Sequence, residues 1–290
     1  MRDRRASRRQ HFGEERLTAS VSLATLSLLV ALGFAVGTLG TLVGAGGGFL
    51  LAPLLLIIYP HDSPQTLTAI SLAAVWANST SGSIAYARQR RIDIRSGIVF
   101  GLATLPGAVG GALAVDHVPR RAFDAIMAAA LAAVAVWITV HGRRSTGRPR
   151  GGSERMLVDA AGREWRYEVR VVRGAAYSLV VGFASSFLGI GGGVFHVPIL
   201  VAGLGFPTHI ATATSHFVLA IMSGAGVLTH LAQGSYAVGH GLRRSLALAV
   251  GVAIGAQLGA RISTRVAAVV IERLLAVALA LVAIRLAFAV

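Results

Sequence analysis

The sequence contains no cysteine and no lysine, and it has little acidic charge. Without cysteine, the chain has no disulfide, no thiolate metal ligand and no thiol nucleophile. All 27 basic residues are arginine, against 12 acidic residues, and charged residues make up only 13% of the chain. Soluble domains carry about 25% charged residues. Together with a hydrophobic share of 54%, this scarcity of charge favours a membrane protein.

A net charge of +15 would suggest nucleic-acid binding in a soluble protein. Here the arginines gather at the ends of apolar runs, where basic residues determine the orientation of a membrane protein. We therefore expect a lipid bilayer as the partner of this chain, and no nucleic acid.

Long apolar runs are spread over most of the chain, and a helix needs about 20 apolar residues to cross a bilayer. The runs lie at 21–43, 66–87, 97–117, 122–141, 174–188 continuing towards 203, 209–230, 242–260 and 266–290. Backbone groups inside a bilayer must be paired within the segment, so these runs predict helices. The sequence predicts an all-α, multi-pass bundle of about eight transmembrane helices in the cytoplasmic membrane.

Two parts of the chain carry the same pattern, in which Gly44–Pro53 (GAGGGFLLAP) aligns with Gly189–Pro198 (GIGGGVFHVP). After a one-residue gap, the same register pairs further residues: Ala69–Ser71 with Ala213–Ser215, Ser79 with Ser223, Gly82 with Gly226, Gly97 with Gly241, Gly107 with Gly251 and Gly111 with Gly255. Such self-similarity indicates a duplicated unit. We expect two homologous transmembrane repeats, 21–141 and 174–290.

A basic tail, 1–20, precedes the first repeat, and a basic linker, 142–173, separates the repeats. The linker alternates around Asp159-Ala-Ala-Gly162, which predicts a β-hairpin on the membrane surface. The arginine distribution favours a cytoplasmic N-terminus and a cytoplasmic central loop. That arrangement requires each glycine-containing segment to cross once and makes the repeats parallel. The alternative, in which these segments cross twice, makes the repeats inverted.

The glycine runs interrupt apolar helices, although each glycine costs about 1 kcal/mol relative to alanine in a helix. Irregular backbone at membrane depth occurs only inside protein or along a water-filled cavity. Phe49–Tyr59 and Val194–Leu204 are too short to span, so each predicts a half-helix that starts at the glycines, with Pro53 and Pro198 near its first turn. Two such N-termini carry partial positive charge and would suit an anion. The alternative is close helix packing through small residues.

The candidate substrate-binding residues belong to the two glycine motifs and to polar positions expected at the same depth. They are Gly44, Gly46, Gly47, Gly48, Pro53, Ser71, Asn78, Gly189, Gly191, Gly192, Gly193, Pro198, Thr214 and Ser215. The acidic residues lie near segment ends, which favours an anionic over a cationic solute. His196 and His216 are candidates for proton coupling, although a histidine bonded within the bundle is the simpler interpretation. No metal spacing, phosphate loop or dinucleotide motif is present, so no cofactor is expected.

The duplicated glycine motifs, Ala213-Thr-Ser215, Arg90-Arg-Ile-Asp93 and the loop around Asp159-Ala-Ala-Gly162 resemble the TauE/SafE, or sulfite exporter, family of membrane permeases. The resemblance covers nearly the whole chain after residue 20. It implies a bundle of about eight helices that transports small sulfur-containing or organic anions, such as sulfite, thiosulfate or sulfonates. Ile70 and Asn78 stand where the second repeat has Thr214 and Met222, so an asymmetric site is expected.

The sequence therefore predicts a non-enzymatic transporter of a small anion, with its site at the two broken helices and with a homo-oligomer as one permitted assembly. A channel is the nearest alternative. A non-transporting scaffold or sensor and a membrane-embedded enzyme are alternatives from other classes.

Overall fold

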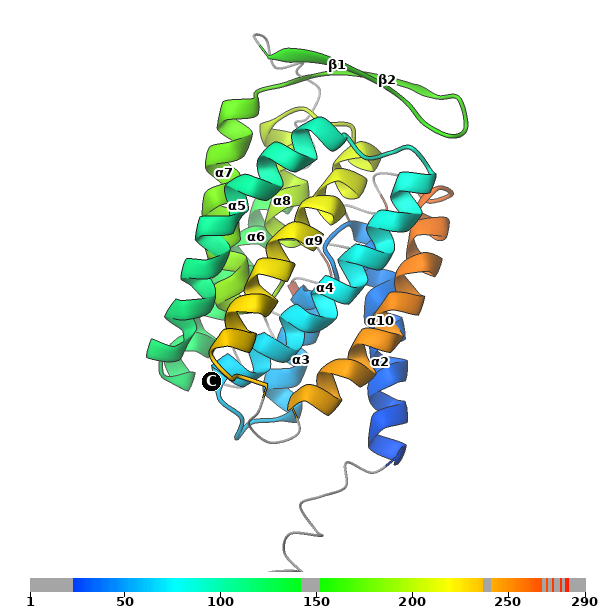
Figure 1. Cartoon of the computed structure of the whole chain (residues 1–290). Helices are drawn as coiled ribbons and strands as arrows, with labels where there is room; N and C mark the ends of the chain where they lie inside the picture. The colour runs from blue at the N-terminus through cyan, green and yellow to red at the C-terminus, as the bar shows by residue number, and fades with distance from the viewer. Residues whose placement is uncertain are drawn as a thin grey trace, which may run out of the picture.

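The computed structural model describes residues 23–141, 152–236 and 241–267, together with positions 270, 273, 277, 280 and 281. The predicted basic tail, part of the linker and most of the last predicted span lie outside these residues. The described part is a bundle of helices with a two-stranded hairpin across one end (Figure 1).

Five helices in the described part are long and apolar enough to cross a membrane. They are α2 (Leu23–Val43), α5 (Ile94–Ala114, extended by the 3₁₀ turn Val115–His117), α7 (Val171–Leu188), α9 (Thr208–Ala232) and α10 (Gly241–Ser263). Two further helices, α4 (Pro64–Arg88) and α6 (Arg120–His141), have 25 and 22 residues. A rise of about 1.5 Å per residue makes both long enough to span. This agrees with the predicted all-α membrane bundle.

Two shorter helical segments follow the glycine runs directly. They are α3 (Gly48–Ile58) and α8 (Gly193–Pro198), and α8 continues as the π-helical turn η2 (Ile199–Gly203). Each covers 11 residues, or roughly 16 Å, which is about half of a bilayer core. Pro53 and Pro198 are each the sixth residue of their helix, so they occupy the second turn and not the first turn that the sequence suggested.

The long helices pair across the two halves of the chain: α2 packs along α10, and α5 packs along α7. Glycines make these contacts close. A Cβ atom on Gly251 would meet Val30 and Phe34, and one on Gly255 would meet Phe34 and Thr38. Because the contacts advance together along both helices, α2 and α10 run in the same direction. Small residues that let backbones approach in this way are typical of membrane helix packing.

The helices that the sequence register pairs, α4 and α9, run in opposite directions. Gly226 lies against Leu72, whereas Gly82 lies against His216, so one helix ascends as the other descends. A pair of parallel repeats would place these two helices in the same direction. The preference for parallel repeats is therefore wrong for this pair, and the helix directions favour the inverted alternative.

Each glycine-containing segment enters the bundle and returns to the end from which it came. The side chain of Ser81 bonds Ala253 of α10, and Gln89 bonds Ala260, so α4 runs parallel to α10 and α2. The start of α2 and the end of α3, which leads into α4, therefore lie at one end (Figure 1). A single net crossing by this segment, as expected from the arginines, is corrected to a re-entrant pair.

The hairpin lies at the opposite end of the bundle from the start of α2 (Figure 1). Its strands, β1 (Ser153–Val158) and β2 (Glu164–Val169), are antiparallel. The hairpin backbone N–H of Ala160 donates to the carbonyl oxygen of Gln89, directly after α4. The start of α2 and the hairpin therefore lie at opposite ends of the bundle, which does not fit the expectation that the N-terminus and the central loop are both cytoplasmic.

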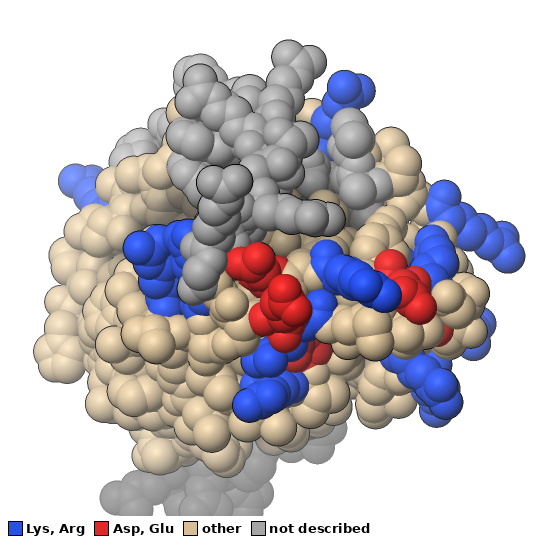
Figure 2. All heavy atoms as spheres, turned by 90° about the horizontal axis from the view of Figure 1, so that it is seen from above, with Lys and Arg blue, Asp and Glu red and all other residues tan. Residues whose placement is uncertain are grey.

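The hairpin packs on the bundle through apolar contacts and carries much of the charge at this end. The rings of Tyr167 and Phe206 lie 4.9 Å apart, and Val169 belongs to the same buried cluster. Figure 2 shows acidic and basic side chains close together on this end. We call this end of the molecule the hairpin end.

Candidate functional site

Each glycine run makes a tight turn that only glycine adopts readily. Gly44 and Gly46 have φ angles of 79° and 74°, and their counterparts Gly189 and Gly191 have 68° and 63°. Left-handed backbone costs other residues roughly 1–2 kcal/mol each. The repeated spacing of glycines in the sequence therefore corresponds to repeated backbone geometry, with a helical segment starting after each turn.

The two turns meet at mid-depth in the bundle. A methyl group added to Gly46 would lie 2.5 Å from Leu219, and one added to Gly191 would overlap Val75. Leu219 and Val75 are each the twelfth residue of a 25-residue helix, α9 and α4. The chain thus reaches the start of α3 from one end of the bundle and the start of α8 from the other end. The two helix N-termini lie side by side near the middle of the molecule.

One serine fastens each turn to the other half of the chain. Ser71 of α4 donates its hydroxyl hydrogen to the carbonyl oxygen of Gly189 at 2.6 Å, and Ser215 of α9 donates to that of Gly44 at 3.3 Å. The sequence paired these serines as candidate substrate ligands. In this conformation both hydroxyl hydrogens are engaged by backbone carbonyls, which gives the serines a structural role.

A cluster of polar side chains lies beside the turns, towards the hairpin end. The Thr41 hydroxyl donates to Asn78 Oδ1 at 2.7 Å, and His216 Nε2 lies 3.1 Å from both Thr41 Oγ1 and Asn78 Oδ1. Asn78 Nδ2 donates to the Gly37 carbonyl at 3.1 Å. We call Thr41, Asn78 and His216 the central polar cluster. All three side chains are fully buried, and they come from α2, α4 and α9.

Sequence reasoning selected Asn78 and His216 but missed Thr41 and Tyr86. The hydroxyl of Tyr86 donates to the Thr41 carbonyl at 2.7 Å, and its ring meets His216 edge-on at 5.6 Å. A threonine three residues before Gly44, in an otherwise apolar run, was the available signal for Thr41. Tyr86 gave no comparable signal because it lies near the end of its helix.

Two other predicted residues lie away from this cluster. Thr214 accepts a hydrogen bond from the Asp93 backbone N–H at 3.0 Å, at the start of α5. His196 Nε2 lies 3.0 Å from Ser178 Oγ, which itself donates to the Gly174 carbonyl. Both His196 and His216 therefore bond within the bundle through Nε2. The Nδ1 atom of each has no hydrogen-bond partner among the described residues.

The buried polar residues around the turns are neutral or histidine, while the buried carboxylates Asp93 and Asp159 lie at the hairpin end. Asp93 caps α5, and Asp159 stabilises the hairpin turn. Among the described residues, no group of three histidine or acidic side chains is arranged to hold a metal ion. The centre of the bundle thus offers hydrogen-bond donors without a buried carboxylate beside them.

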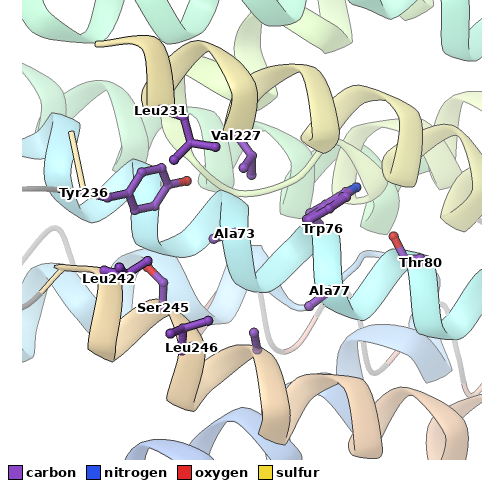
Figure 3. A pocket seen from close by; sticks show the side chains of 11 residues that line it. Ala73, Trp76, Ala77, Thr80, Val227, Leu231, Tyr236, Leu242, Ser245 and Leu246 are labelled. Atoms are coloured by element: carbon purple, nitrogen blue, oxygen red, sulfur yellow. The ribbon is translucent and has the colours of Figure 1, made fainter. Parts of the chain in front are cut away.

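A separate apolar crevice of about 330 Å³ opens between α4, α9 and α10 (Figure 3). Figure 3 shows Trp76 and Tyr236 on either side of Ala73. The crevice is lined by Ala73, Trp76, Ala77, Thr80, Val227, Leu231, Tyr236, Leu242, Ser245, Leu246 and Ala249. None of the predicted site residues is among them and no charged side chain lines it, so this crevice is unsuited to an anion.

Comparisons with known proteins point to membrane transporters. The model of the family described as "Sulfite exporter TauE/SafE" matches residues 29–286. The probable membrane transporter protein YunE of Bacillus subtilis is 28% identical over 214 residues, covering 71% of this chain and 78% of YunE. The probable membrane transporter protein MJ0441 of Methanocaldococcus jannaschii is also 28% identical over 214 residues, covering 72% of this chain and 73% of that protein. No solved structure matches the chain.

Proposed function

Because the chain belongs to the sulfite exporter TauE/SafE family, a family of membrane transporters, we propose that it carries a small anion of the sulfur oxyanion or organosulfonate class across the cytoplasmic membrane. The anion binds where α3 and α8 begin, next to the central polar cluster. The two halves act as inverted repeats, each contributing one re-entrant pair of helices.

The meeting of the two glycine turns at mid-depth is the observation that supports this proposal most strongly. A helix N-terminus carries about half a positive charge and exposes unpaired backbone N–H groups. Transporters with paired broken helices bind anionic groups at such N-termini near the bilayer midplane. Close packing through small residues explains Gly251 and Gly255, but it does not require two turns with the same positive φ angles.

The central polar cluster gives this region donors that suit an oxyanion. Hydroxyl, amide and imidazole groups donate hydrogen bonds without fixing a full charge inside the bundle. A cation site would call for an intramembrane carboxylate. The buried polar groups near the turns are instead uncharged or histidine, and they include Thr41, Ser71, Asn78, Ser215 and His216.

The conformation described here is closed around the turns, since Val75 and Leu219 cover the glycines and the two serines bond backbone carbonyls. Transport then requires that the turns separate from each other. Inverted repeats supply such a motion when one half rocks against the other around a fixed site.

The test is uptake by the purified full-length protein in proteoliposomes. Sulfite, thiosulfate, sulfate, an alkylsulfonate, a carboxylate and a cation are each offered with and without a pH gradient. Saturable uptake of one sulfur-containing anion is expected, and the Gly46→Leu/Gly191→Leu double variant should abolish it. Stimulation by the pH gradient would add proton coupling, for which His196 and His216 are the candidates.

Gly162→Leu is the matched control, because Gly162 has a φ of 78° but an added Cβ there would meet nothing within 4 Å. This variant should keep the uptake. If folded protein binds an anion without moving any, a scaffold or sensor is the better function. Transport of the cation alone would refute the anion site.

A further inference from the structure

Arg90-Arg91-Ile-Asp93 links α4 to α5 at the hairpin end, and the transport proposal gives it no role. Its two arginines differ sharply in environment. Arg90 is exposed, whereas only 2% of Arg91 is accessible to solvent. Asp93 caps α5 through the backbone N–H of Ser96 and accepts a hydrogen bond from the Tyr167 hydroxyl. The motif therefore buries one guanidinium group and one carboxylate, at separate places.

Arg91 makes only part of the hydrogen bonds that its side chain can donate. Its Nη1 donates to Gln89 Oε1 at 3.2 Å and to Ser263 Oγ at 3.5 Å. Its Nε and Nη2 atoms are buried and have no partner among the described residues. These two nitrogens form one edge of the guanidinium plane, the edge that binds carboxylate, sulfate and phosphate groups with two parallel hydrogen bonds.

The carboxylates closest to this region are engaged by other groups. Asp159 forms an ion pair with Arg163 at 2.9 Å, and Asp93 lies 3.7 Å from Arg155. Within the described chain, no carboxylate oxygen lies within 4 Å of Arg91. Burial lowers the pKa of Arg91, but an arginine keeps its proton in proteins. A buried cation without a counter-charge is costly, so this site calls for an anion.

The surroundings of Arg91 include basic and aromatic side chains, and the nearby carboxylate of Asp159 is paired with Arg163. The guanidinium of Arg163 lies over the Trp165 ring at 5.7 Å, and the Trp165 ring meets that of His209 at 6.1 Å. The Ala160 backbone N–H donates to the Gln89 carbonyl, which brings the hairpin turn next to the loop that carries Arg91. Basic side chains are prominent on this end in Figure 2.

We propose that Arg91 forms a second anion site, which binds a small tetrahedral or pyramidal oxyanion through Nε and Nη2 beneath the hairpin. The occupant supplies the contacting negative charge that no carboxylate of the described residues gives to Arg91. Its chemistry is that of a sulfate or phosphate group, whether free in solution or on a lipid headgroup.

The site adjoins the central polar cluster through Tyr86. The backbone N–H of Arg91 donates to the Tyr86 carbonyl at 3.2 Å, and the Tyr86 hydroxyl donates to the Thr41 carbonyl. One buried tyrosine therefore separates the outer site from Thr41 and His216. If the proposed transport is correct, an anion held at Arg91 waits at the hairpin-end entrance to the central site.

The experiment uses Trp165 as a local reporter in the full-length protein. The Trp76→Phe/Trp137→Phe variant leaves Trp165 as the only tryptophan. Its fluorescence is titrated with sodium sulfate in phosphatidylcholine nanodiscs, against sodium chloride at equal ionic strength. We expect a saturable change with sulfate that chloride does not produce.

Arg91→Gln in the same background should raise the sulfate concentration at half-saturation by at least about tenfold, because a charge-assisted bidentate contact is lost. Arg90→Gln removes the same charge one residue away, on the exposed side chain, and should leave the titration unchanged. Arg91→Lys keeps the positive charge but lacks the two parallel guanidinium donors, so it should bind sulfate with intermediate affinity. This variant tests the site if Arg91→Gln does not fold. Equal curves for wild type, Arg91→Gln and Arg91→Lys, or no sulfate response, would overturn the proposal.

Two further arms separate the sources of the anion and the two proposed sites. Phosphatidylglycerol in the nanodiscs should leave the sulfate response intact if the occupant is a free ion, whereas loss of the response would assign the site to a lipid headgroup. The Gly46→Leu/Gly191→Leu variant should still bind sulfate at Arg91, as reported by the fluorescence of Trp165. Binding in that variant without transport in the wild type would refute the transport proposal alone.

Discussion

The two faces of the glycine turns have matching backbones but different side chains. Towards the hairpin end, Gly82 of α4 lies against His216, which bonds Thr41 and Asn78. On the other face, the same register places Gly226 of α9 against Leu72 and Ser186. Met222 there replaces Asn78, and the Ser186 hydroxyl has no hydrogen-bond partner among the described residues.

This difference separates the roles of backbone and side chain. The glycines, and the serines that bond the glycine turn of the other half, occur in both halves and hold the backbone of the two turns in place. The side chains beside these turns form a hydrogen-bonded cluster on one face, whereas the other face has Leu72, Met222 and the buried, unpartnered hydroxyls of Ser185 and Ser186. Hydrogen bonds are directional and costly to leave unmade, whereas apolar contacts are non-directional. A solute at the turns would therefore meet a connected set of polar side chains only on the hairpin face, and isolated serine hydroxyls on the other.

The strongest way to remove the difference is Asn78→Met, which copies Met222 into the first half. The change removes the Asn78 Oδ1 acceptor shared by Thr41 and His216 and the amide donor to the Gly37 carbonyl, which costs roughly 1–3 kcal/mol. Uptake of the transported anion by proteoliposomes should fall at least about tenfold. Met222→Leu, at the matching position, should retain most of the wild-type rate. Equal losses in the two variants would show that the hairpin face has no special part in transport.

The crossed serine bonds offer a second comparison, because the Ser71 bond is 2.6 Å long and the Ser215 bond 3.3 Å. Ser71→Ala should lower the unfolding free energy by about 1 kcal/mol, and Ser215→Ala by less. Thermal unfolding in detergent measures both. Ser27→Ala, at a more exposed position of α2, serves as the control. A larger loss of unfolding free energy for Ser215→Ala than for Ser71→Ala would contradict the expectation that the shorter hydrogen bond contributes more.

The hairpin end should also respond to acid. Burial opposes ionisation of Asp159, but hydrogen bonds from Arg163, Trp165 and Ala161 outweigh it and lower its pKa. A depressed folded-state pKa adds stability above the unfolded value of about 3.9 and loses it as pH falls further. Trp165 fluorescence should be constant from pH 8 to pH 5 and change below about pH 4. Asp159→Asn should remove this acid step, and an unchanged step would assign it to another group.

The smallest effect concerns the loops that follow α4 and α9. Arg90 has a φ of 53°, and Gly234, at the matching position, has 71°. Gly234→Ala should destabilise the protein by about 1 kcal/mol through backbone strain alone, since an added Cβ there meets nothing within 4 Å. Arg90→Gly should stabilise it by less than that amount, because glycine also gains freedom in the unfolded chain. Melting temperatures that move in the opposite sense would refute this reasoning.

The helices and the turn of the hairpin were predictable because local patterns determine them. Apolar runs predicted α2, α4 and α9 to within two residues at each end, and Asp159-Ala-Ala-Gly162 predicted a turn. The helix directions were not predictable in this way. The positive-inside argument weighed Arg88–Arg95 as loop charge, but Arg91 is buried under the hairpin.

The candidate site was predictable only in part, because its contacts join distant residues. The glycine motifs were selected from the repeat, and Asn78 was selected as a polar residue expected at the same depth. Thr41 and His216 lie 175 residues apart in sequence, so no local pattern links them. The bonds that engage Ser71 and Ser215 depend on the meeting of two turns from different halves of the chain, which the sequence of neither turn determines alone.

The pairing of α2 with α10 has a consequence for how the protein is made. α10 starts almost 200 residues after α2 ends. A ribosome that adds about 5–20 residues per second needs roughly 10–40 s for that interval. Throughout it, α2 is in the membrane without the helix that covers its glycine-lined face. Its retention until α10 arrives falls to the lipid or to the insertion machinery, so truncated nascent chains that end before Gly241 should expose this face to crosslinking.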